Sequence, residues 1–323
     1  MENKKTTLAE GQDHILDVEH LSMYFTTKNK GKKSTVKAVD DVSFYVKRGE
    51  TFGLVGESGC GKTTTGRTII RLYDPTGGTV KFNDREISGK MNKELHQYIT
   101  DNIAMIFQDP IASLNPRMTV QEIIAEGLKI RGVKDPEELR TRVIRMLEHV
   151  GLQAEHASRY PHEFSGGQRQ RIGIARALIV EPQMVIADEP VSALDVSVQA
   201  QVINLLNKLK GEMGLTILFI AHNLSVVKYF SNRIGVMYFG KLVEMADSEE
   251  LFKNPLHPYT KALLSAIPEP DPRKEKKRVK LHYDSEMHHY SESNLPFYHE
   301  VSPGHTIYCS DEEFDEYRKE WKP

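Results

Sequence analysis

A glycine-rich segment between an apolar run and a helical pattern constrains this chain more than any other feature. The apolar run covers residues 51–55, helical spacing covers residues 64–72, and between them lies Gly56-Glu57-Ser58-Gly59-Cys60-Gly61-Lys62-Thr63. Strand, glycine-rich turn and helix is the context of a phosphate-binding loop, because bare glycine backbone lets successive N–H groups converge beside the positive helix end. The alternative is a glycine-rich turn that matches the pattern by accident.

Each polar residue of such a loop has its own expected contact. Lys62 reaches the β- and γ-phosphates, and the Thr63 hydroxyl is a ligand of Mg²⁺. We expect Thr64 to extend the nucleotide contacts into the first helical turn. The segment therefore predicts a nucleoside triphosphate site, without saying what the nucleotide is used for.

Composition narrows the class of protein. The chain has 323 residues, a net charge of −2 and two cysteines, Cys60 and Cys309. The charge argues against a dominant nucleic-acid surface, and two cysteines are too few for a disulfide framework or a cysteine-held cluster. No apolar run approaches the length of a membrane span, and residues 1–12 lack the apolar core of a signal peptide. We expect a cytoplasmic protein.

The first part of the chain indicates a β-rich layer beside the nucleotide-binding core. Residues 15–25 read as a strand that ends in Tyr24 and Phe25, and residues 39–46 read as a second strand. The lysine-rich stretch between them, residues 28–37, is expected to be a solvated loop. Residues 74–78 contain proline and two glycines, and they are expected to form a turn in a short hairpin that continues through residues 80–82.

Periodicity then changes from strand to helix, which predicts an inserted helical lobe after Gln108. An apolar strand over residues 103–107 ends there. One helix is marked by apolar residues between 120 and 128. A second begins at Asp135 and Pro136, a capping side chain followed by proline at the first helical position, and stops at Gly151.

Short apolar strands alternate with amphipathic helices in the next part. Strands are expected over residues 183–187, 215–221 and 234–238, with a helix over 198–209. This alternation predicts an α/β fold with a mainly parallel sheet covered on both faces. The proline-rich residues 268–272 are expected to mark the end of compact structure, followed by a small polar addition.

Two neighbouring carboxylates, Asp188 and Glu189, follow the first of these strands. Ligand groups gather at the carboxyl ends of parallel strands, so Asp188 is the candidate to hold Mg²⁺ opposite the phosphate loop. Glu189 is the natural group to orient and deprotonate an attacking water. The alternative is an acidic helix cap after a strand.

A second glycine-rich helix start lies far from the first, at Phe164-Ser165-Gly166-Gly167-Gln168. Ser165 would cap the following helix and the two glycines leave its backbone bare, which creates another anion site. One nucleotide does not normally need two such cradles from one subunit. The economical interpretation is two facing copies, each offering its second cradle to the nucleotide of the other.

These motifs, in this order, resemble the nucleotide-binding subunits of ABC transporters over roughly residues 16–264. The resemblance covers the phosphate loop, a glutamine loop at Gln108, the signature segment 164–168, the metal strand with Asp188 and Glu189, a D-loop at residues 192–195 and a switch histidine at His222. It implies a P-loop NTPase core with an N-terminal antiparallel β layer, an inserted helical lobe and a C-terminal extension.

The resemblance also implies roles for single residues. Gln108 would touch Mg²⁺ or the attacking water, and His222 would contact the γ-phosphate. Asp195 would act across the dimer interface beside Ser165, Gly166, Gly167 and Gln168. Phe25, or alternatively Tyr24, would stack on adenine.

A finer resemblance, to the ATPases of oligopeptide and dipeptide importers, rests on residues 254–264, 107–116 and 168–171. It implies ATP and Mg²⁺ as cofactors, peptide uptake through two separate transmembrane permease subunits, an extracellular substrate-binding protein and a peripheral location on the cytoplasmic face of the membrane. A paralogous ATPase partner is favoured over a second identical copy. Many such ATPases hold an iron–sulfur cluster in a cysteine-rich tail, but Cys309 is alone in this tail, so no cluster is expected.

Two other functions remain open at this point. An ATPase of the same build could drive uptake of another small solute such as nickel. A soluble ABC ATPase could instead act on nucleic acid or ribosomes, although those usually fuse two cassettes or insert long coiled coils. We expect no nucleic-acid partner.

The expected organisation is an N-terminal tail over residues 1–12, an ATPase core over 13–107 and 180–255, a helical subdomain with the signature over 108–179, and an extension over 256–323. The tail histidines, such as His288 and His305, are expected to be solvated rather than to bind metal. The basic run 273–280 is interpreted as a charged linker rather than a lipid contact. The helix start beside Cys60 is expected to lower the pKa of its thiol.

Overall fold

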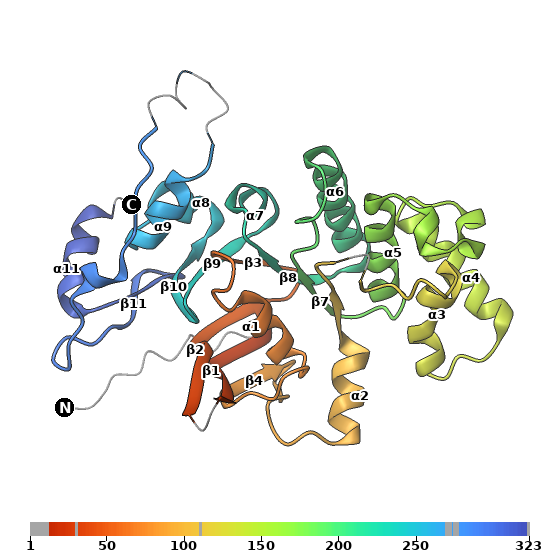
Figure 1. Ribbon diagram of the computed structural model, residues 1–323, viewed down its shortest axis with the longest axis horizontal. Coiled ribbons are helices and arrows are strands. Elements are labelled where there is room, and N and C mark those ends of the chain that lie inside the picture. The colour runs from red at the N-terminus through yellow and green to blue at the C-terminus, as the bar shows by residue number, and fades with distance from the viewer. Residues whose placement is uncertain (1–12, 30–31, 110–111, 269–272, 274–277, 322–323) are drawn as a thin grey trace. The chain divides into compact units, whose positions relative to one another are not determined.

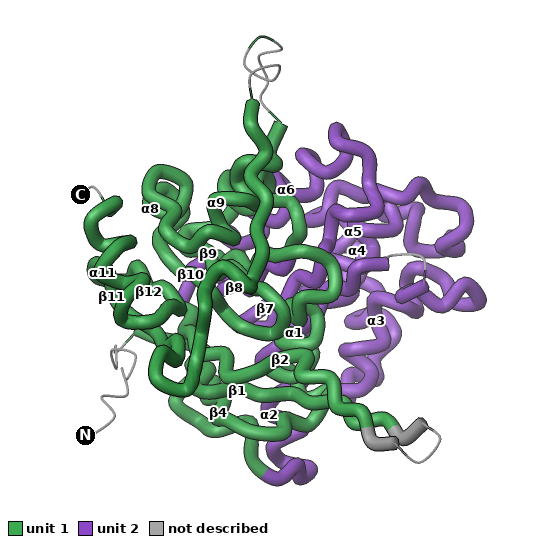
Figure 2. Tube along the Cα trace, turned by 60° about the vertical axis from the view of Figure 1, so that its left-hand side comes forward, with its two compact units in different colours: residues 1–47, 51–89, 221–323 green, residues 48–50, 90–220 purple. Residues whose placement is uncertain are grey.

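The computed structural model describes residues 13–29, 32–109, 112–268, 273 and 278–321 (Figure 1). The expected N-terminal tail, residues 1–12, and residues 274–277 of the basic run 273–280 lie outside these residues. The chain forms two compact units, which Figure 2 colours separately. Unit 1 comprises residues 1–47, 51–89 and 221–323, and unit 2 comprises residues 48–50 and 90–220.

Unit 1 begins with an antiparallel sheet in the strand order β2-β1-β4-β5. Its strands are β1 (His14–Asn29), β2 (Lys32–Lys47), β4 (Gly77–Phe82) and β5 (Arg85–Glu86). Leu16, Val18, Phe44 and Val46 are fully buried on one face, while their sequence neighbours are less buried. This period of two is the pattern of a strand with one face on a core. The expected N-terminal β layer is confirmed.

The lysine-rich stretch is not the loop that its composition predicted. Its described residues, 28–29 and 32–37, continue the β1–β2 ladder, with Phe25 opposite Val36 and Thr27 opposite Ser34. The Thr26 and Thr35 hydroxyl oxygens lie 3.3 Å apart across the strands. Cross-strand pairing with β-branched residues stabilises the extended backbone, and lysines are tolerated on exposed strands.

A second group of strands in unit 1 has the order β11-β12-β10-β9-β3. Strand β3 runs parallel to β9, with Val55 opposite Val236, and β9 runs antiparallel to β10. The strands are β3 (Thr51–Val55), β9 (Arg233–Tyr238), β10 (Lys241–Asp247), β11 (Phe297–Ser302) and β12 (His305–Cys309). The helices are α1 (Lys62–Ile69), α7 (Leu224–Phe230), α8 (Ser248–Lys253), α9 (Pro258–Ser265), the short η3 (Ser285–His288) and α11 (Asp311–Glu320).

The expectation that compact structure ends near residue 268 is wrong. Strand β12 joins the sheet beside β10, with Ile307 opposite Glu244. Ile307 and Cys309 are fully buried together with Leu256 and Tyr317. The polar composition of residues 282–323 gave no indication of this small core, because the β11–β12 hairpin and α11 each bury only one narrow apolar face.

Two of the tail histidines are buried, which also corrects the sequence-based expectation. His305 Nε2 lies 2.9 Å from Glu244 Oε1, and His288 lies against Tyr283 and Glu313. Glu244 also accepts the backbone N–H groups of Leu256 and His257 at 2.8 and 3.0 Å. Buried polar groups are tolerated because such partners replace water. Among the described residues, no group of three or more His, Cys, Asp or Glu side chains has the arrangement of a metal site.

Unit 2 contains three parallel strands in the order β8-β7-β6. They are β6 (Ile103–Ile106), β7 (Met184–Asp188) and β8 (Thr216–Ala221), whose last residue is assigned to unit 1. The helices are α2 (Lys93–Asn102), α3 (Val120–Ile130), α4 (Pro136–His149), α5 (Gly166–Leu178) and α6 (Val196–Met213), with short 3₁₀ turns η1 (Ala154–Ser158) and η2 (Pro161–Glu163). Strands β7 and β8 are buried along their whole length, as expected of a parallel sheet covered on both faces.

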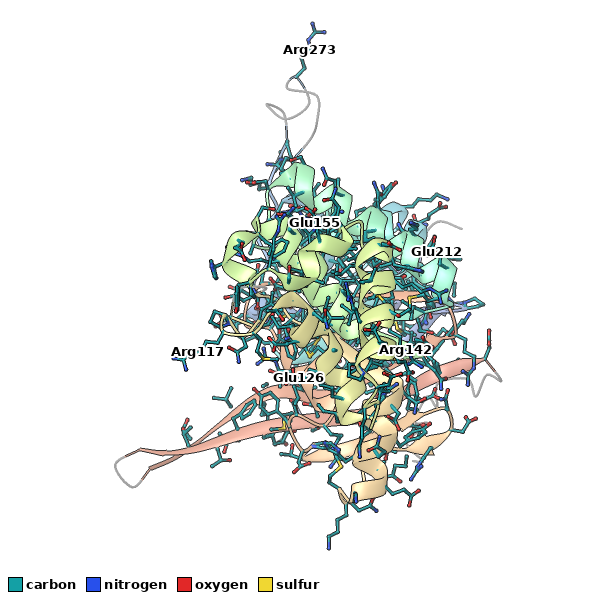
Figure 3. All side chains as sticks on the ribbon, turned by 90° about the vertical axis from the view of Figure 1, so that its right-hand side faces the viewer. Arg117, Glu126, Arg142, Glu155, Glu212 and Arg273 are labelled. Atoms are coloured by element: carbon teal, nitrogen blue, oxygen red, sulfur yellow. The ribbon has the colours of Figure 1, made fainter. Side chains whose placement is uncertain are left out.

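Helix α4 begins and ends at the signals expected from the sequence. Asp135 caps α4 by accepting the N–H of Glu137 at 3.1 Å, and Pro136 occupies the first helical position. Gly151 follows the helix with φ +73°, a left-handed conformation that glycine adopts without a steric penalty. Figure 3 shows charged side chains around this unit, such as Glu126 of α3 and Arg142 of α4, and both are exposed.

The predicted fold class is confirmed: an α/β protein with an antiparallel N-terminal sheet, further strands that are parallel around the phosphate loop, and a helical segment after β6. Among the described residues, the structure has no helix with the length and apolarity that a membrane crossing requires.

His257 gives the fold a testable dependence on pH. It is 2% exposed, and burial, followed by the nearby positive charges of His288 and Lys261, lowers its pKa to about 3. The unfolded chain takes up a proton at this side chain near pH 6.5, whereas the folded chain stays neutral. Stability is therefore unaffected by this group above about pH 6.5 and is lost as the pH falls from there toward 3.

We expect His257→Asn to remove this acid sensitivity and keep the helix cap, since His257 Nδ1 accepts the N–H of Tyr259 and asparagine can do the same. Urea unfolding at several pH values should show the slope of the unfolding free energy reduced by about 1.4 kcal/mol per pH unit between pH 6 and 4. The exposed His282→Asn is the matched control. Equal slopes for wild type and His257→Asn would contradict the assignment.

Candidate functional site

The glycine-rich segment of unit 1 leaves β3 at Val55 and enters α1 at Lys62. Within it, Gly61 has φ +110°, and a Cβ on this residue would lie 2.2 Å from the carbonyl oxygen of Ala38. Only glycine fits both the conformation and the space. Glu57, Ser58 and Gly59 are exposed, so the loop presents backbone at the protein surface.

The start of α1 has the properties of an anion site. Gly61 occupies the cap position without a side-chain hydrogen bond, and the first turn contains no acidic residue. The first N–H groups of a helix have no partner within the helix, and the helix dipole places positive charge there. Thr63 and Thr64 lie in this first turn and are half-buried.

Lys62 places a buried positive charge under the loop. Its side chain is 3% exposed, and Nζ donates to the carbonyl oxygens of Gly56 and Glu57, each at 2.8 Å. A buried ammonium needs such acceptors because it has lost its hydration. The charge, the uncapped helix start and the glycine backbone together form a cradle for phosphate groups.

The pKa of the Cys60 thiol differs from the expectation. The residue is 5% exposed, and burial raises the pKa of its thiol, although Lys62 nearby acts in the opposite direction. The expected lowering was wrong because the cost of removing a thiolate from water outweighs the attraction of Lys62 and the helix end.

The two aromatic residues of β1 have different surroundings. Phe25 is half-buried, and its ring meets the Tyr73 ring edge-on at 5.3 Å. Tyr24 is held more firmly, because its hydroxyl donates to Asp40 at 2.5 Å and Lys37 lies over its ring. His222, also assigned to unit 1, follows β8 and is exposed.

In unit 2, the structure brings Gln108 and Glu189 together at the carboxyl ends of neighbouring strands. Gln108 follows β6 by two residues, and its Nε2 donates to Glu189 Oε2 at 3.2 Å. Asp188 ends β7 and is fully buried. Glu189 has φ +44°, an uncommon conformation for a residue with a side chain, and its N–H donates to Ile220 O at 2.9 Å.

The signature segment forms a capped helix start. Ser165 Oγ accepts the N–H of Gln168 at 3.4 Å, and Gln168 Oε1 accepts the N–H of Ser165 at 3.0 Å. This reciprocal pair is a capping box. The ring of Phe164 is 4% exposed and fixes the chain before the cap. Ser165 and Gly166 are exposed, so the backbone of this helix start is accessible.

The signature lies against the segment that follows Glu189. A Cβ on Gly167 would lie 2.5 Å from Val198 Cγ1, and one on Gly166 would lie 3.6 Å from Leu194 Cδ2. Asp195 caps α6 by position and is exposed. Unit 2 therefore holds the signature, the D-loop, Gln108 and the two carboxylates, and unit 1 holds the phosphate loop, Phe25 and His222.

Sequence reasoning missed one contact to the phosphate loop. The Tyr259 hydroxyl, at the start of α9, accepts the backbone N–H of Glu57 at 3.0 Å. The two residues are far apart in the chain, and a tyrosine on a helix carries no pattern that indicates such a contact.

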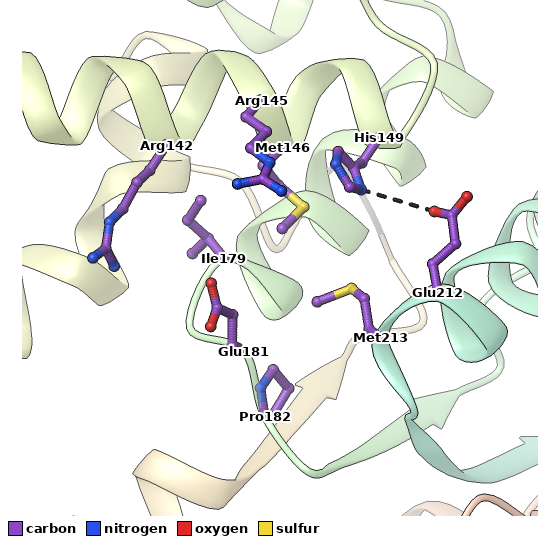
Figure 4. Close-up of a pocket in the computed structure, with 9 residues that line it drawn as sticks. All are labelled: Arg142, Arg145, Met146, His149, Ile179, Glu181, Pro182, Glu212 and Met213. Carbon is purple, nitrogen blue, oxygen red and sulfur yellow. Dashed lines mark ion pairs between the residues drawn. The ribbon is translucent and has the colours of Figure 1, made fainter.

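Unit 2 also has a cavity of about 440 Å³ between α4, the end of α5 and the end of α6 (Figure 4). His149 of α4 points toward Glu212 of α6, and His149 Nδ1 lies 3.9 Å from Glu212 Oε2. None of the predicted site residues lines it. Its mixed charges and exposed rim give no sign of a defined ligand.

Two protein families match this chain. The ABC transporter family matches residues 39–192, and the family described as oligopeptide/dipeptide transporter, C-terminal region, matches residues 243–292.

Curated relatives match over nearly the full length. The oligopeptide transport ATP-binding protein OppF of Bacillus subtilis is 58% identical over 303 residues, which cover 94% of this chain and 98% of that protein. The dipeptide transport ATP-binding protein DppF of Lactococcus lactis is 50% identical over 308 residues, which cover 94% and 97%.

Solved structures agree. The dimeric post-hydrolysis structure of the ATP-binding cassette MJ0796 with ADP and Pi is 29% identical, covers 72% of this chain and 98% of that chain, and has a TM-score of 0.65. The cbiO1 structure from Clostridium perfringens, part of the ABC transporter complex cbiONQ, is 27% identical, covers 75% and 92%, and has a TM-score of 0.64. The expected resemblance is confirmed. The chain belongs to the ABC transporter ATP-binding proteins that carry the oligopeptide/dipeptide-transporter C-terminal region.

Proposed function

We propose that this protein binds and hydrolyses ATP to energise the uptake of oligopeptides or dipeptides through separate permease subunits. The observation that carries the proposal is the uncapped start of α1 with Lys62 buried beneath the glycine backbone. The names of the relatives, which are oligopeptide and dipeptide transport ATP-binding proteins, support the choice of cargo. They do not favour nickel or another small solute, nor an action on nucleic acid or ribosomes.

The phosphate loop, residues 56–63, and Thr64 would hold the triphosphate of ATP. Lys62 would exchange its bonds to two loop carbonyls for the β- and γ-phosphate oxygens, a change of acceptors that keeps its N–H groups hydrogen-bonded and pairs its charge with the phosphates. Phe25 would stack on adenine, whereas the Tyr24 hydroxyl is held by Asp40.

Oxygen ligands suited to Mg²⁺ are available at the ends of the parallel strands. The Thr63 hydroxyl, the buried Asp188 carboxylate and the Gln108 amide oxygen would hold the ion, which when bound neutralises charge on the phosphates.

Glu189 is proposed as the catalytic base. It would accept a proton from the water that attacks the γ-phosphate. Its bond to Gln108 fixes the carboxylate at the strand end, and Gln108 would sense departure of the phosphate through that contact. His222 would contact the γ-phosphate from its exposed position after β8.

The second anion site favours a dimer. Ser165, Gly166, Gly167 and Gln168 present a helix start that would bind the γ-phosphate held by another subunit, with Asp195 alongside. The ATP-binding cassette MJ0796 with ADP and Pi is dimeric, which supports a dimer for this chain. We propose a paralogous ATPase as the partner, in preference to an identical copy.

The remaining partners follow from the importer assignment. They are two transmembrane permease subunits and an extracellular substrate-binding protein, with this ATPase bound peripherally at the cytoplasmic face of the membrane. The proposed division of the chain is a core over residues 13–107 and 180–255, a helical subdomain over 108–179 and an extension over 256–323. No iron–sulfur cluster and no nucleic acid have a part in the proposal.

The base assignment predicts separable effects on hydrolysis and binding. Glu189→Gln should lower the steady-state ATPase rate of the assembled transporter about 100-fold or more, because proton transfer is lost. MgATP binding should persist, and the variant should form a stable dimer with itself or its paralogue. The exposed Glu148→Gln is the matched control. A Glu189→Gln protein that hydrolyses ATP at the wild-type rate would contradict the role.

The rate at which the Cys60 thiol is labelled should show whether MgATP is bound at the glycine-rich loop. Because this thiol is buried and its pKa raised, we expect maleimide to label it several-fold more slowly than an exposed thiol at pH 7.5, and more slowly again with MgATP. Mass spectrometry of the labelled peptide measures both rates, and a Cys60→Ser protein gives the background from Cys309. Equal labelling with and without MgATP would count against the loop as the nucleotide site.

The cargo can be tested in cells. Deletion of this chain should abolish uptake of a labelled tripeptide, and unlabelled di- and tripeptides should compete with the label in wild type. Purification of the membrane complex should recover integral membrane subunits and a second ATPase. Normal peptide uptake together with loss of nickel uptake would instead favour an ATPase that drives nickel import.

A further inference from the structure

A single peptide group at the base of the phosphate loop is held from both sides. The N–H of Glu57 donates to the Tyr259 hydroxyl at 3.0 Å, and the carbonyl of Gly56 accepts from Lys62 Nζ at 2.8 Å. This N–H and this carbonyl belong to the same peptide group between residues 56 and 57. Because a peptide group is planar and rigid, whatever fixes its N–H also fixes the direction of its carbonyl.

This peptide lies where the backbone has unusual freedom. Gly56 has φ +153°, and a Cβ on it would lie 2.2 Å from the carbonyl oxygen of Met237. Glycine is therefore required here, yet glycine restricts rotation of the following peptide less than any other residue does. Glu57 beyond it is exposed. A fixed hydrogen-bond partner is the direct way to hold such a peptide in one orientation.

Tyr259 is itself firmly placed by the C-terminal region. It is 2% exposed, its ring lies 4.5 Å from the Tyr238 ring and 5.3 Å from the Tyr283 ring, and its N–H is capped by His257. The preceding backbone is anchored in turn, because Glu244 accepts the N–H groups of Leu256 and His257. A side chain packed this way loses little further entropy when it holds the loop.

We expect a bound triphosphate to affect the two hydrogen bonds to this peptide group differently. Lys62 must turn part of its hydrogen bonding from the loop carbonyls to the phosphates. The bond from the Glu57 N–H to Tyr259 includes neither Lys62 nor an N–H group of the first turn of α1, which are the groups expected to bind the phosphates. It can therefore persist and keep the peptide from rotating once Lys62 has moved.

We propose that Tyr259 is a positioning residue of the nucleotide site, and that its hydroxyl holds the Gly56–Glu57 peptide so that the phosphate loop keeps its binding shape. The assignment rests on the proposed function only in taking ATP as the ligand. It makes nucleotide affinity depend on the C-terminal region, although no residue of that region needs to touch the nucleotide.

The test is Tyr259→Phe in the full-length chain, which keeps the ring and removes only the hydroxyl. MgATP affinity, measured by calorimetry, should fall about threefold to tenfold, the effect of one neutral hydrogen bond. In the assembled transporter, KM for ATP should rise by a similar factor with kcat nearly unchanged, because the hydroxyl lies away from the reacting atoms. Tyr238→Phe, which changes a neighbouring ring of the same cluster, is the matched control and should bind MgATP as wild type does.

A second measurement includes one comparison, wild type with and without MgATP, that needs no variant. Amide exchange of Glu57, followed by NMR, should be slow in wild type both with and without MgATP, and faster in Tyr259→Phe with an unchanged melting temperature. Fast exchange in wild type with MgATP bound would overturn the proposal, as would equal affinities of Tyr259→Phe and wild type. Failure of wild type itself to bind MgATP would instead refute the proposed function, and this inference with it.

Discussion

The buried ammonium of Lys62 is the interaction on which the rest of the structure depends. A positively charged group that is almost completely buried needs hydrogen-bond acceptors in place of water. Here the carbonyl oxygens of Gly56 and Glu57 are those acceptors. That requirement explains why the loop curls back over the helix start, and the curl is possible because Gly61 has no Cβ to meet the carbonyl oxygen of Ala38. The same charge, released from the carbonyls, is what attracts a phosphate group.

The C-terminal region contributes directly to the structure around the glycine-rich loop. Glu244 is fully buried beside His305 and anchors the start of α9, from which Tyr259 reaches the loop. Buried carboxylates are costly unless every oxygen has a partner, so this network specifies one arrangement of β10, α9 and β12. Unit 1 thereby connects residues 243–292, which match the C-terminal region of oligopeptide/dipeptide transporters, to the glycine-rich loop that we propose as the phosphate site.

Local signals predicted several helix starts and ends. The cap at Asp135, the stop at Gly151 and the serine cap at Ser165 each act over a few residues, so the sequence contains the whole interaction. The lysine-rich hairpin and the β11–β12 strands were not predicted, because their stability comes from cross-strand pairs rather than from residues nearby in the chain. The pKa of Cys60 was mispredicted for a related reason, since burial is a property of the folded chain.

The sequence by itself determined which chemistry the chain carries: a phosphate loop, a second glycine-rich helix start, two carboxylates after a strand, and a place among ABC transporter ATPases. Tertiary structure alone decided that Gln108 meets Glu189, that two tail histidines are buried, and that Tyr259 reaches Glu57. The physical reason is that motif chemistry depends on residue types at short spacing, whereas these contacts join residues far apart in the chain. Such contacts form only when packing of the whole unit supplies the free energy that orders them.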